Sequence, residues 1–449
     1  MAKSEVAASK PASAGRLLKI LGVGFGIAVA IGTTISAGIV RTPGEIAARL
    51  HLPWLFLGVW VVGGVYALIS SFSLSELGAM IPREGGQYVF ARRALGDYAG
   101  FVVGWSDWVS NCSSIALIAI VIGEYGGDLL PALRDHATAT ALSATTVMAM
   151  LQWRGVRWGS RIQEITAALK ALGFVALVVL CFAVGGNSHV SSVTAPPALR
   201  AWPSLAGLLL SLQAVIFTYD GWDSIVYFLE EVRDPGREVP QAMIGSVLSV
   251  LGIYLLLNIG LIYVMPIESF AGSDFALGLA ARRIFGAHGD AVIQAIMIVS
   301  LVSGVNAILL EGSRILFGMS RDGFFTRRGA AVNAGGTPNA ALLLTTLTAI
   351  AFILTGSFEK VLAVTAFFFV ANYTVSFASV FVLRRREPQA ERPYRAWGYP
   401  WTTGLALGVS LAFLCSAIAG DTRNTLWALG VLALSYPVYR VSKQLARPG

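Results

Sequence analysis

The chain has 449 residues, of which 55% are hydrophobic and only 13% are charged, and its formal net charge is +8. Ordinary soluble domains carry about 25% charged residues, so this composition excludes a soluble globular protein. The basic residues form short clusters between apolar runs, which is typical of membrane-orientation signals and not of a nucleic-acid-binding surface. The three cysteines lie inside apolar runs and do not indicate a disulfide framework.

The succession of apolar runs predicts an all-α membrane protein with twelve transmembrane helices. Residues 1–16 are polar and rich in small residues, and we expect a cytoplasmic tail there, because the following apolar run is too long for a signal peptide. A helix of about 20 residues crosses a bilayer. Runs of suitable length, bounded by charged residues, proline or glycine, lie at 17–50, 53–80, 95–127, 137–153, 161–184, 203–230, 239–264, 286–318, 338–356, 358–383, 400–419 and 423–440.

The basic residues predict the orientation of these helices. If the N-terminus is cytoplasmic, most of the 33 lysines and arginines lie in the two tails or in the junctions after even-numbered helices. Arg384, Arg385 and Arg386, after the tenth run, are an example. By the positive-inside rule, we expect both termini in the cytoplasm.

Two of the predicted helices, the first and the sixth, contain residues that interrupt a helix. Residues 32–38 (GTTISAG) are small, β-branched or hydroxyl-bearing, and residues 217–223 (FTYDGWD) place a glycine and two carboxylates in an apolar run. Each interruption falls in the first helix of a block of five, as in inverted repeats that hold a substrate at the bilayer midplane. We therefore expect repeats at 17–202 and 203–384, two more helices within 385–440, and a cytoplasmic tail at 441–449.

Interrupted helices can bind a zwitterion. An unwound backbone exposes amides, which bind an anion at a helix N-terminus, and carbonyls, which accept hydrogen bonds from an ammonium. An alternative interpretation is that Gly32, Gly38 and Gly221 only allow close helix packing.

Ionisable residues inside the predicted helices are further functional candidates, because each costs roughly 2.5 to 3.5 kcal/mol to insert. Structural roles remain open for several of them: Glu311 and Arg314 are spaced for an i,i+3 ion pair, and Asp107 could hydrogen-bond a neighbouring helix. The ammonium of Lys170 must find carbonyls or a carboxylate. The full set is Asp107, Lys170, Asp220, Asp223, Glu311 and Arg314.

Six motifs resemble the amino acid, polyamine and organocation superfamily, and within it bacterial relatives of the L-type amino acid transporters. They are Ile35-Ser36-Ala37-Gly38-Ile39-Val40; ELGAMIP at 76–82 with GGQY at 85–88; Gln163 with Lys170; FTYDGW at 217–222 with 230–240; Arg314 with MSRDG at 319–323; and RPY at 392–394 with Tyr399-Pro400.

The resemblance implies a LeuT-like fold with a 5+5 inverted repeat, broken helices 1 and 6, and two additional helices. It implies a plasma (inner) membrane location in a bacterium, and Lys170 as a coupling residue where sodium sits in sodium-coupled relatives. Phe217 would be the extracellular gate. The substrate carboxylate would meet the backbone at Ser36, Ala37 and Gly38, and the α-amino group would meet carbonyls at Ile35, Phe217 and Asp220.

The resulting hypothesis is a sodium-independent amino acid transporter that works by alternating access, either as an exchanger or as a proton-coupled carrier. Asp220 and Asp223 either face the cavity, where they would admit neutral and cationic L-amino acids and repel anionic ones, or they cap helix ends. We expect no cofactor and no bound metal. We also expect no heavy-chain partner, because residues 125–137 lack the cysteine that links one, and a monomer or weak homo-oligomer.

Three alternative functions differ from this hypothesis. A polyamine or amine antiporter would share the same fold. A non-transporting amino acid sensor would normally carry a long cytoplasmic tail. A membrane-embedded enzyme would need catalytic residues in a cluster, whereas His51, His136, His189 and His288 are scattered and no HExxH spacing occurs.

Overall fold

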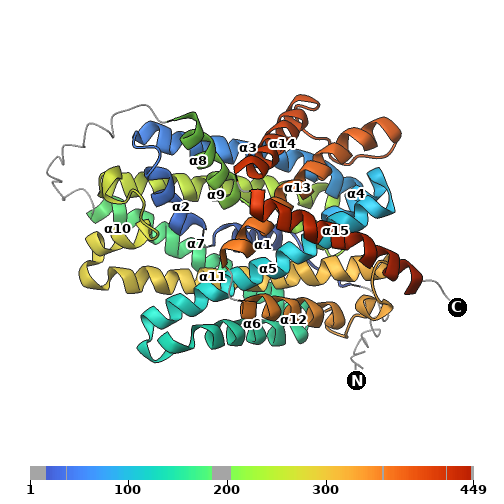
Figure 1. Cartoon of the computed structure of the whole chain (residues 1–449), viewed down its shortest axis with the longest axis horizontal. Coiled ribbons are helices and arrows are strands. Elements are labelled where there is room, and N and C mark those ends of the chain that lie inside the picture. The colour runs from blue at the N-terminus through green and yellow to red at the C-terminus, as the bar shows by residue number, and fades with distance from the viewer. Residues whose placement is uncertain (1–16, 37, 185–203, 356–357, 421, 446–449) are drawn as a thin grey trace, which may run out of the picture.

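The computed structural model describes residues 17–36, 38–184, 204–355, 358–420 and 422–445, and the regular elements in them are helices (Figure 1). The predicted tail at 1–16 and the last residues of the predicted tail at 441–449, namely 446–449, lie outside the described residues.

The first half of the chain contains seven α-helices. A short 3-10 helix, η1 (Pro131–His136), joins the fifth to the sixth. The α-helices are α1 (Val23–Thr34), α2 (Gly38–Ala47), α3 (Pro53–Met80), α4 (Gln87–Leu95), α5 (Asp97–Leu129), α6 (Ala137–Trp153) and α7 (Val156–Val184).

In the described part of the second half there are eight α-helices and four short 3-10 helices. The α-helices are α8 (Leu205–Thr218), α9 (Pro235–Val264), α10 (Ala276–Phe285), α11 (Gly289–Arg321), α12 (Asn339–Thr355), α13 (Phe358–Arg386), α14 (Trp401–Gly420) and α15 (Thr422–Leu445). The 3-10 helices are η4 (Ser224–Phe228), η5 (Ile267–Ser269), η6 (Gly286–His288) and η7 (Arg327–Ala330).

Each predicted apolar run contains a helix, and the differences lie at the ends and in the connections. The seventh run begins earlier than predicted, at Pro235, because proline is favoured at the first position of a helix. Helices α4 and α10 were not predicted. Both are short and carry two arginines in the last turn, yet each buries several of its apolar side chains, so they are connectors that lie against the helix bundle.

Seven of the described helices are long and apolar enough to cross a membrane, and the bent pair α1 and α2 would make an eighth. The seven include α3, α5, α7, α9, α11, α13 and α14. The all-helical part of the prediction is confirmed, and the number of spans stays a prediction.

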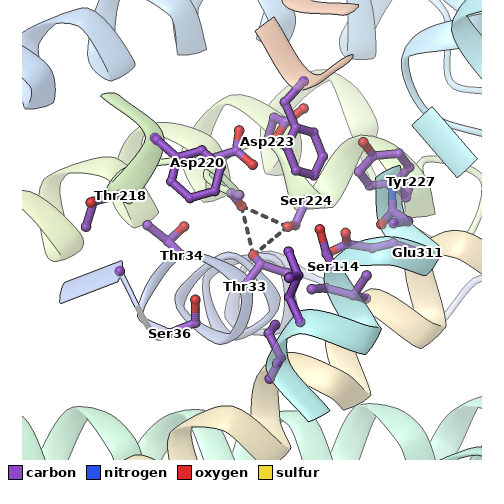
Figure 2. Close-up of a pocket in the computed structure, with 18 of the residues that line it drawn as sticks. Thr33, Thr34, Ser36, Ser114, Thr218, Asp220, Asp223, Ser224, Tyr227 and Glu311 are labelled. Carbon is purple, nitrogen blue, oxygen red and sulfur yellow. Dashed lines mark hydrogen bonds between the residues drawn. The ribbon is translucent and has the colours of Figure 1, made fainter. Parts of the chain in front are cut away.

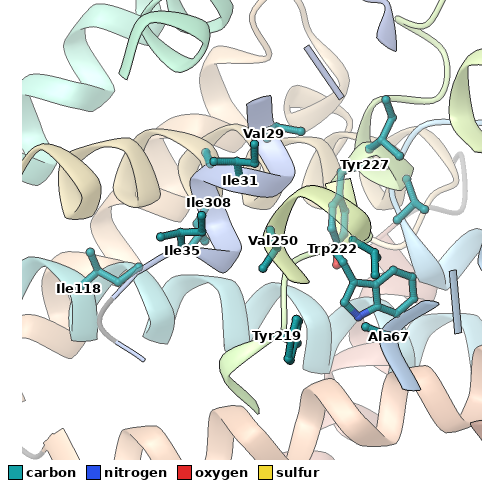
Figure 3. Close-up of a cluster of buried hydrophobic side chains, with 14 of the residues drawn as sticks. Val29, Ile31, Ile35, Ala67, Ile118, Tyr219, Trp222, Tyr227, Val250 and Ile308 are labelled. Atoms are coloured by element: carbon teal, nitrogen blue, oxygen red, sulfur yellow. The ribbon is translucent and has the colours of Figure 1, made fainter. Parts of the chain in front are cut away.

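The long helices pair in a regular way. Helix α3 packs along α9, α5 packs along α11, and α6 packs against α12. Helix α1 lies in the middle of the bundle, in contact with α7, α9 and α11 (Figure 1). Val29 and Ile31 of α1, and Ile35 just after it, belong to a buried apolar cluster that also contains Tyr219 and side chains from neighbouring helices (Figure 3).

The helix is interrupted at both predicted positions. Helix α1 ends at Thr34, and α2 begins at Gly38 with its axis bent by 50°. Helix α8 ends at Thr218, and the chain turns through Gly221, whose φ of +102° favours glycine. A Cβ on Gly221 would lie 2.7 Å from the Thr33 hydroxyl oxygen, so the two interruptions touch.

A group of ion pairs, here called the arginine network, joins the ends of α3, α11 and α13 to the segment before α9. At its centre Arg314 is fully buried, with Nε 2.9 Å from a Glu231 carboxylate oxygen and 3.8 Å from one of Glu84. Glu76 pairs with Arg384 at 2.5 Å and with Arg392 at 3.2 Å.

The arginine network extends to the loop after α11. Asp322 pairs with Arg83 at 2.8 Å and with Arg92 at 2.5 Å, and Arg321 pairs with Glu230. Beside it the backbone of Leu21 forms a bridge to the segment after η4: its amide donates to Glu231 O at 2.8 Å, and its carbonyl accepts from the amide of Arg233 at 3.2 Å.

Candidate functional site

A cavity of about 120 Å³ lies between the two interrupted helices. Its walls come from α1 and α2, from the turn between α8 and η4, and from α5, α11 and α13. Figure 2 looks into this cavity, with Thr33 and Ser224 at its centre and carboxylates around them. Apolar residues such as Leu117, Ile118 and Phe369 complete the lining.

The structure brings most of the predicted binding residues together. Ile35 does not line the cavity: it is buried, and its carbonyl accepts from Lys170 Nζ at 2.6 Å and from the Ser300 hydroxyl at 2.7 Å. Ala37 lies outside the described residues. The predicted residues that line the cavity are Ser36, Gly38, Phe217, Asp220 and Asp223.

The start of α2 forms one side of the cavity. The first amides of a helix have no partner within it, so those of Gly38, Ile39 and Val40 are donors without intrahelical acceptors. A Cβ on Gly38 would lie 3.2 Å from the Thr218 methyl carbon, a tight approach. The hydroxyls of Thr218 and Thr42 are in turn 2.7 Å apart. Glycine at position 38 therefore keeps this helix end open and close to α8.

Lys170 stabilises the end of α1. Its side chain is fully buried, and its ammonium donates to the carbonyls of Ile31 at 3.2 Å, Gly32 at 2.9 Å and Ile35 at 2.6 Å. The carbonyls lie where the helix stops and the regular pattern of backbone hydrogen bonds ends; that of Ile31 also accepts from the amide of Ile35 at 3.1 Å. One α7 face thus carries Lys170 and, two turns earlier, Gln163, which donates to Ala28 O at 3.1 Å.

Hydroxyl groups connect the two interruptions directly. Thr33 Oγ1 lies 3.0 Å from Gly221 O and 2.8 Å from Ser224 Oγ, and the Ser224 hydroxyl donates to Gly221 O at 2.8 Å (Figure 2). The first and sixth predicted helices are therefore held together at the cavity by polar contacts that a relative movement would break.

Asp220 and Asp223 share one partner. The Tyr373 hydroxyl on α13 lies 2.7 Å from Asp220 Oδ1 and 2.9 Å from Asp223 Oδ1. The Gln87 amide donates to the other oxygen of Asp223 at 2.8 Å. Asp223 is thus anchored at both oxygens, whereas Asp220 lines the cavity with one oxygen anchored.

Asp107 lies behind the cavity. It accepts from the Tyr227 hydroxyl at 3.0 Å and from the Asn111 amide at 3.2 Å, so it bonds a neighbouring segment, one of the two roles considered for it. Tyr227 and Asn111 line the cavity.

Glu311 lines the cavity from α11. Its carboxyl contacts the Ser224 hydroxyl, and its Oε1 has no hydrogen-bond partner among the described residues. The i,i+3 pair with Arg314 considered from the spacing is wrong, because Arg314 turns to Glu231 instead.

A family model for amino acid permeases matches residues 26–436. This chain belongs to that family. The chain is 26% identical over 431 residues to the serine/threonine exchanger SteT of Bacillus subtilis, covering 94% of this chain and 96% of the relative. It is 27% identical over 387 residues to the Asc-type amino acid transporter 1 of Mus musculus, covering 84% and 73% of the two chains. The human large neutral amino acids transporter small subunit 2 is 25% identical over 426 residues, covering 90% and 79%.

The family membership confirms several predictions. The resemblance stated from the motifs is correct, and this permease is an amino acid transporter and a multi-pass, all-helical membrane protein. These conclusions extend over nearly the whole chain, because the matched residues run from α1 to α15.

Several cavity residues of this permease were not predicted. The cavity is assembled from helices far apart in sequence, so the sequence does not show which polar side chains face it. The residues that were not predicted are Asn111, Ser114, Ser224, Tyr227 and Tyr373. Ser224 alone has a local signal, because it directly follows the interruption at 217–223. Glu311 was noted only as an ionisable residue in a span.

Proposed function

We propose that this permease exchanges small and medium-sized neutral L-amino acids, and cationic ones in addition, across a bacterial inner membrane without sodium. The observation that carries the proposal is the cavity between two interrupted helices that touch through Thr33 and Gly221. Alternating access would open this cavity to each side in turn. The names of the relatives, a serine/threonine exchanger among them, support exchange of neutral substrates.

The substrate backbone would lie at the start of α2. Its carboxylate would accept from the amides of Ser36, Ala37 and Gly38, where the helix dipole is positive. Its ammonium would face the carbonyls of Phe217 and Asp220, with the Asp220 carboxylate beside them. The ring of Phe217 would close the cavity toward the outside.

Two predicted residues would act differently from the rest. The carbonyl of Ile35 already accepts from Lys170 and Ser300, so Ile35 would contribute by fixing the break. Asp223, anchored by Tyr373 and Gln87, would act through its charge.

Lys170 would take the place of a sodium ion. Its ammonium would supply a positive charge to the three backbone carbonyls that converge at the first break. A cation fixed to the chain needs no ion from solution, which supports sodium-independent transport.

The proposed architecture is LeuT-like, with twelve membrane helices. The pairs α3 and α9, α5 and α11, and α6 and α12 join corresponding helices of the repeats at 17–202 and 203–384, which supports the inverted arrangement. Helices α14 and α15 would be the additional pair within 385–440. We propose that the protein works as a monomer or weak homo-oligomer without a heavy chain.

Both termini would be cytoplasmic. Leu21 bonds to Glu231 at the arginine network, and Lys443 near the end of α15 contacts Asp97 at 3.4 Å, beside Arg92 of the same network. The two ends of the described chain therefore lie on one side, and that side is rich in arginine, as the positive-inside rule requires of a cytoplasmic face.

Counterflow in proteoliposomes tests the proposal. Purified protein is reconstituted in sodium-free buffer, and uptake of labelled serine is compared between vesicles loaded with unlabelled serine and empty ones. We expect uptake only into loaded vesicles, unchanged by added sodium and not inhibited by glutamate. Uptake into empty vesicles under an inward proton gradient would replace exchange by proton coupling, inhibition by putrescine alone would favour an amine antiporter, and absence of any flux would overturn the proposal.

A further inference from the structure

One carboxyl that lines the cavity has no cationic partner in the described part of the protein. Glu311 is only 4% exposed, and its Oε1 has no hydrogen-bond partner among the described residues. Burying an unpaired carboxylate is costly, so such a group is neutral or meets a cation supplied from outside the chain.

The nearby cations are committed elsewhere. Arg314, three residues further along α11, bonds Glu231 at 2.9 Å. Lys170 donates to three backbone carbonyls at the end of α1. Among the described ion pairs, none includes Glu311.

The other carboxyls around the cavity differ from Glu311. Asp223 is anchored at both oxygens. Asp107 accepts from Tyr227 and Asn111 at one oxygen, and although its Oδ2 has no hydrogen-bond partner among the described residues, it does not line the cavity. Asp220 lies next to the proposed position of the substrate α-ammonium. Glu311 is therefore the cavity carboxyl that is available to pair with a second positive group of the substrate.

The positions of these groups give a direction along the cavity. In Figure 2, Ser36 and Asp220 lie on one side of the Thr33 and Ser224 hydroxyls, and Glu311 lies on the other side. A substrate whose backbone binds at Ser36 and Asp220 would extend its side chain past Thr33 and Ser224 toward Glu311.

We propose that Glu311 is the counter-charge for a side-chain ammonium, so that diamino acids bind in the same cavity as neutral amino acids. The inference rests on the proposed function and names the residue that extends it to cationic substrates. An ammonium at Glu311 would form a charge-assisted hydrogen bond in a water-poor site, where such bonds are strong. The negative charges of Asp107, Asp220 and Asp223 would add to the attraction, whereas an anionic side chain would be repelled.

Competition binding with a chain-length series tests the inference. Purified full-length protein binds labelled serine, and the competitors are 2,3-diaminopropionate, 2,4-diaminobutyrate, ornithine and lysine, each paired with the neutral homologue of equal length. We expect at least one diamino acid to compete better than its neutral homologue. Because a hydrogen bond to a charged group is stronger than one between neutral groups, Glu311→Gln should lower the affinity for that diamino acid, relative to serine, by roughly tenfold or more.

Two variants serve as controls. Glu387→Gln makes the same chemical change at an exposed position outside the cavity and should leave the ratio of the two affinities as in the wild type. Glu311→Asp retracts the carboxylate by one methylene and should move the preference to the next longer diamino acid. This shift of preference decides the question even if Glu311→Gln fails to fold.

Three results would overturn the inference. The first is that the wild type binds serine and rejects every diamino acid. The second is that Glu311→Gln weakens the binding of serine and of diamino acids equally. The third is that Glu311→Gln keeps diamino acid binding and removes the pH dependence of serine exchange, which would make Glu311 a proton carrier. Failure to bind or exchange any amino acid would instead count against the proposed function.

Discussion

The carboxylates of the arginine network and those around the cavity differ in what neutralises them. In the network, Glu76, Glu231 and Asp322 each lie within 2.9 Å of an arginine. Around the cavity, Glu311 is buried and Asp220 is partly buried. Both contact hydroxyl groups, and no described ion pair includes them.

This difference separates charges that hold the fold from charges that await a ligand. A buried pair is satisfied within the chain, and removing one partner leaves a charge that nothing else compensates. A carboxyl beside a cavity can obtain its counter-charge from whatever enters. The following predictions test this distinction, beginning with the largest expected effect.

Removal of the central arginine of the arginine network should cause the largest loss of stability. Arg314→Gln leaves Glu231 and Glu84 buried without a cation, and removing one member of a buried pair typically costs about 3 to 5 kcal/mol. We expect a large drop in the melting temperature of the purified protein. The double variant Arg314→Gln, Glu231→Gln should recover part of the loss, and a melting temperature for Arg314→Gln equal to that of the wild type would contradict this role.

Lys170 is a buried cation that donates hydrogen bonds to backbone carbonyls instead of to carboxylates. Lys170→Ala leaves the carbonyls of Ile31, Gly32 and Ile35 without this donor, so the break can no longer be held through the transport cycle. With about 1.5 to 3 kcal/mol for a hydrogen bond to a charged group, serine exchange should fall by roughly 10- to 100-fold and serine binding by much less. The exposed Lys443→Ala serves as the control. Equal losses of binding and exchange, or a sodium requirement in the wild type, would refute the assignment.

The anion-binding side of the cavity depends on Gly38. Gly38→Val places a branched side chain within about 3.2 Å of Thr218 and beside the free amides of α2, so serine affinity should fall by about tenfold, or 1.4 kcal/mol. Gly24→Val is the matched control, because a Cβ on Gly24 has no atom within 4 Å. Wild-type affinity in folded Gly38→Val would remove this helix end from the proposed site.

An exposed pair should contribute least. Arg93 donates to Glu387 at 2.6 and 3.2 Å, and these hydrogen bonds lower the pKa of the Glu387 carboxyl. A lowered pKa in the folded state stabilises the protein above the unfolded pKa of about 4.3, and this contribution is lost as the pH falls through the folded value. Glu387→Gln should therefore cost at most about 0.5 kcal/mol at pH 7.

The melting temperatures of Glu387→Gln and the wild type should converge in acid. A difference that persists or grows as the pH falls below 4 would show that the pair does not act through its charge.

The sequence predicted those features that are local along the chain. The interruptions at Gly32 to Gly38 and around Gly221 were visible because small and polar residues stand out in apolar runs. The partners of Asp220 were not visible, because Tyr373 lies 153 positions away. The pairing of Arg314 was predicted wrongly for the same reason: its spacing from Glu311 indicated a shared helix face, but the carboxylate that it contacts, Glu231, comes from a distant segment.

The backbone bridge of Leu21 has a consequence for measurement. Its two hydrogen bonds tie the chain before α1 to the segment after η4, and any motion that opens this face must separate them. The amide protons of Leu21 and Arg233 should therefore exchange with deuterium only while this face is open. Hydrogen–deuterium exchange at these two amides, with and without saturating serine, therefore measures the fraction of time for which this face of the transporter is open, with no label attached to the protein.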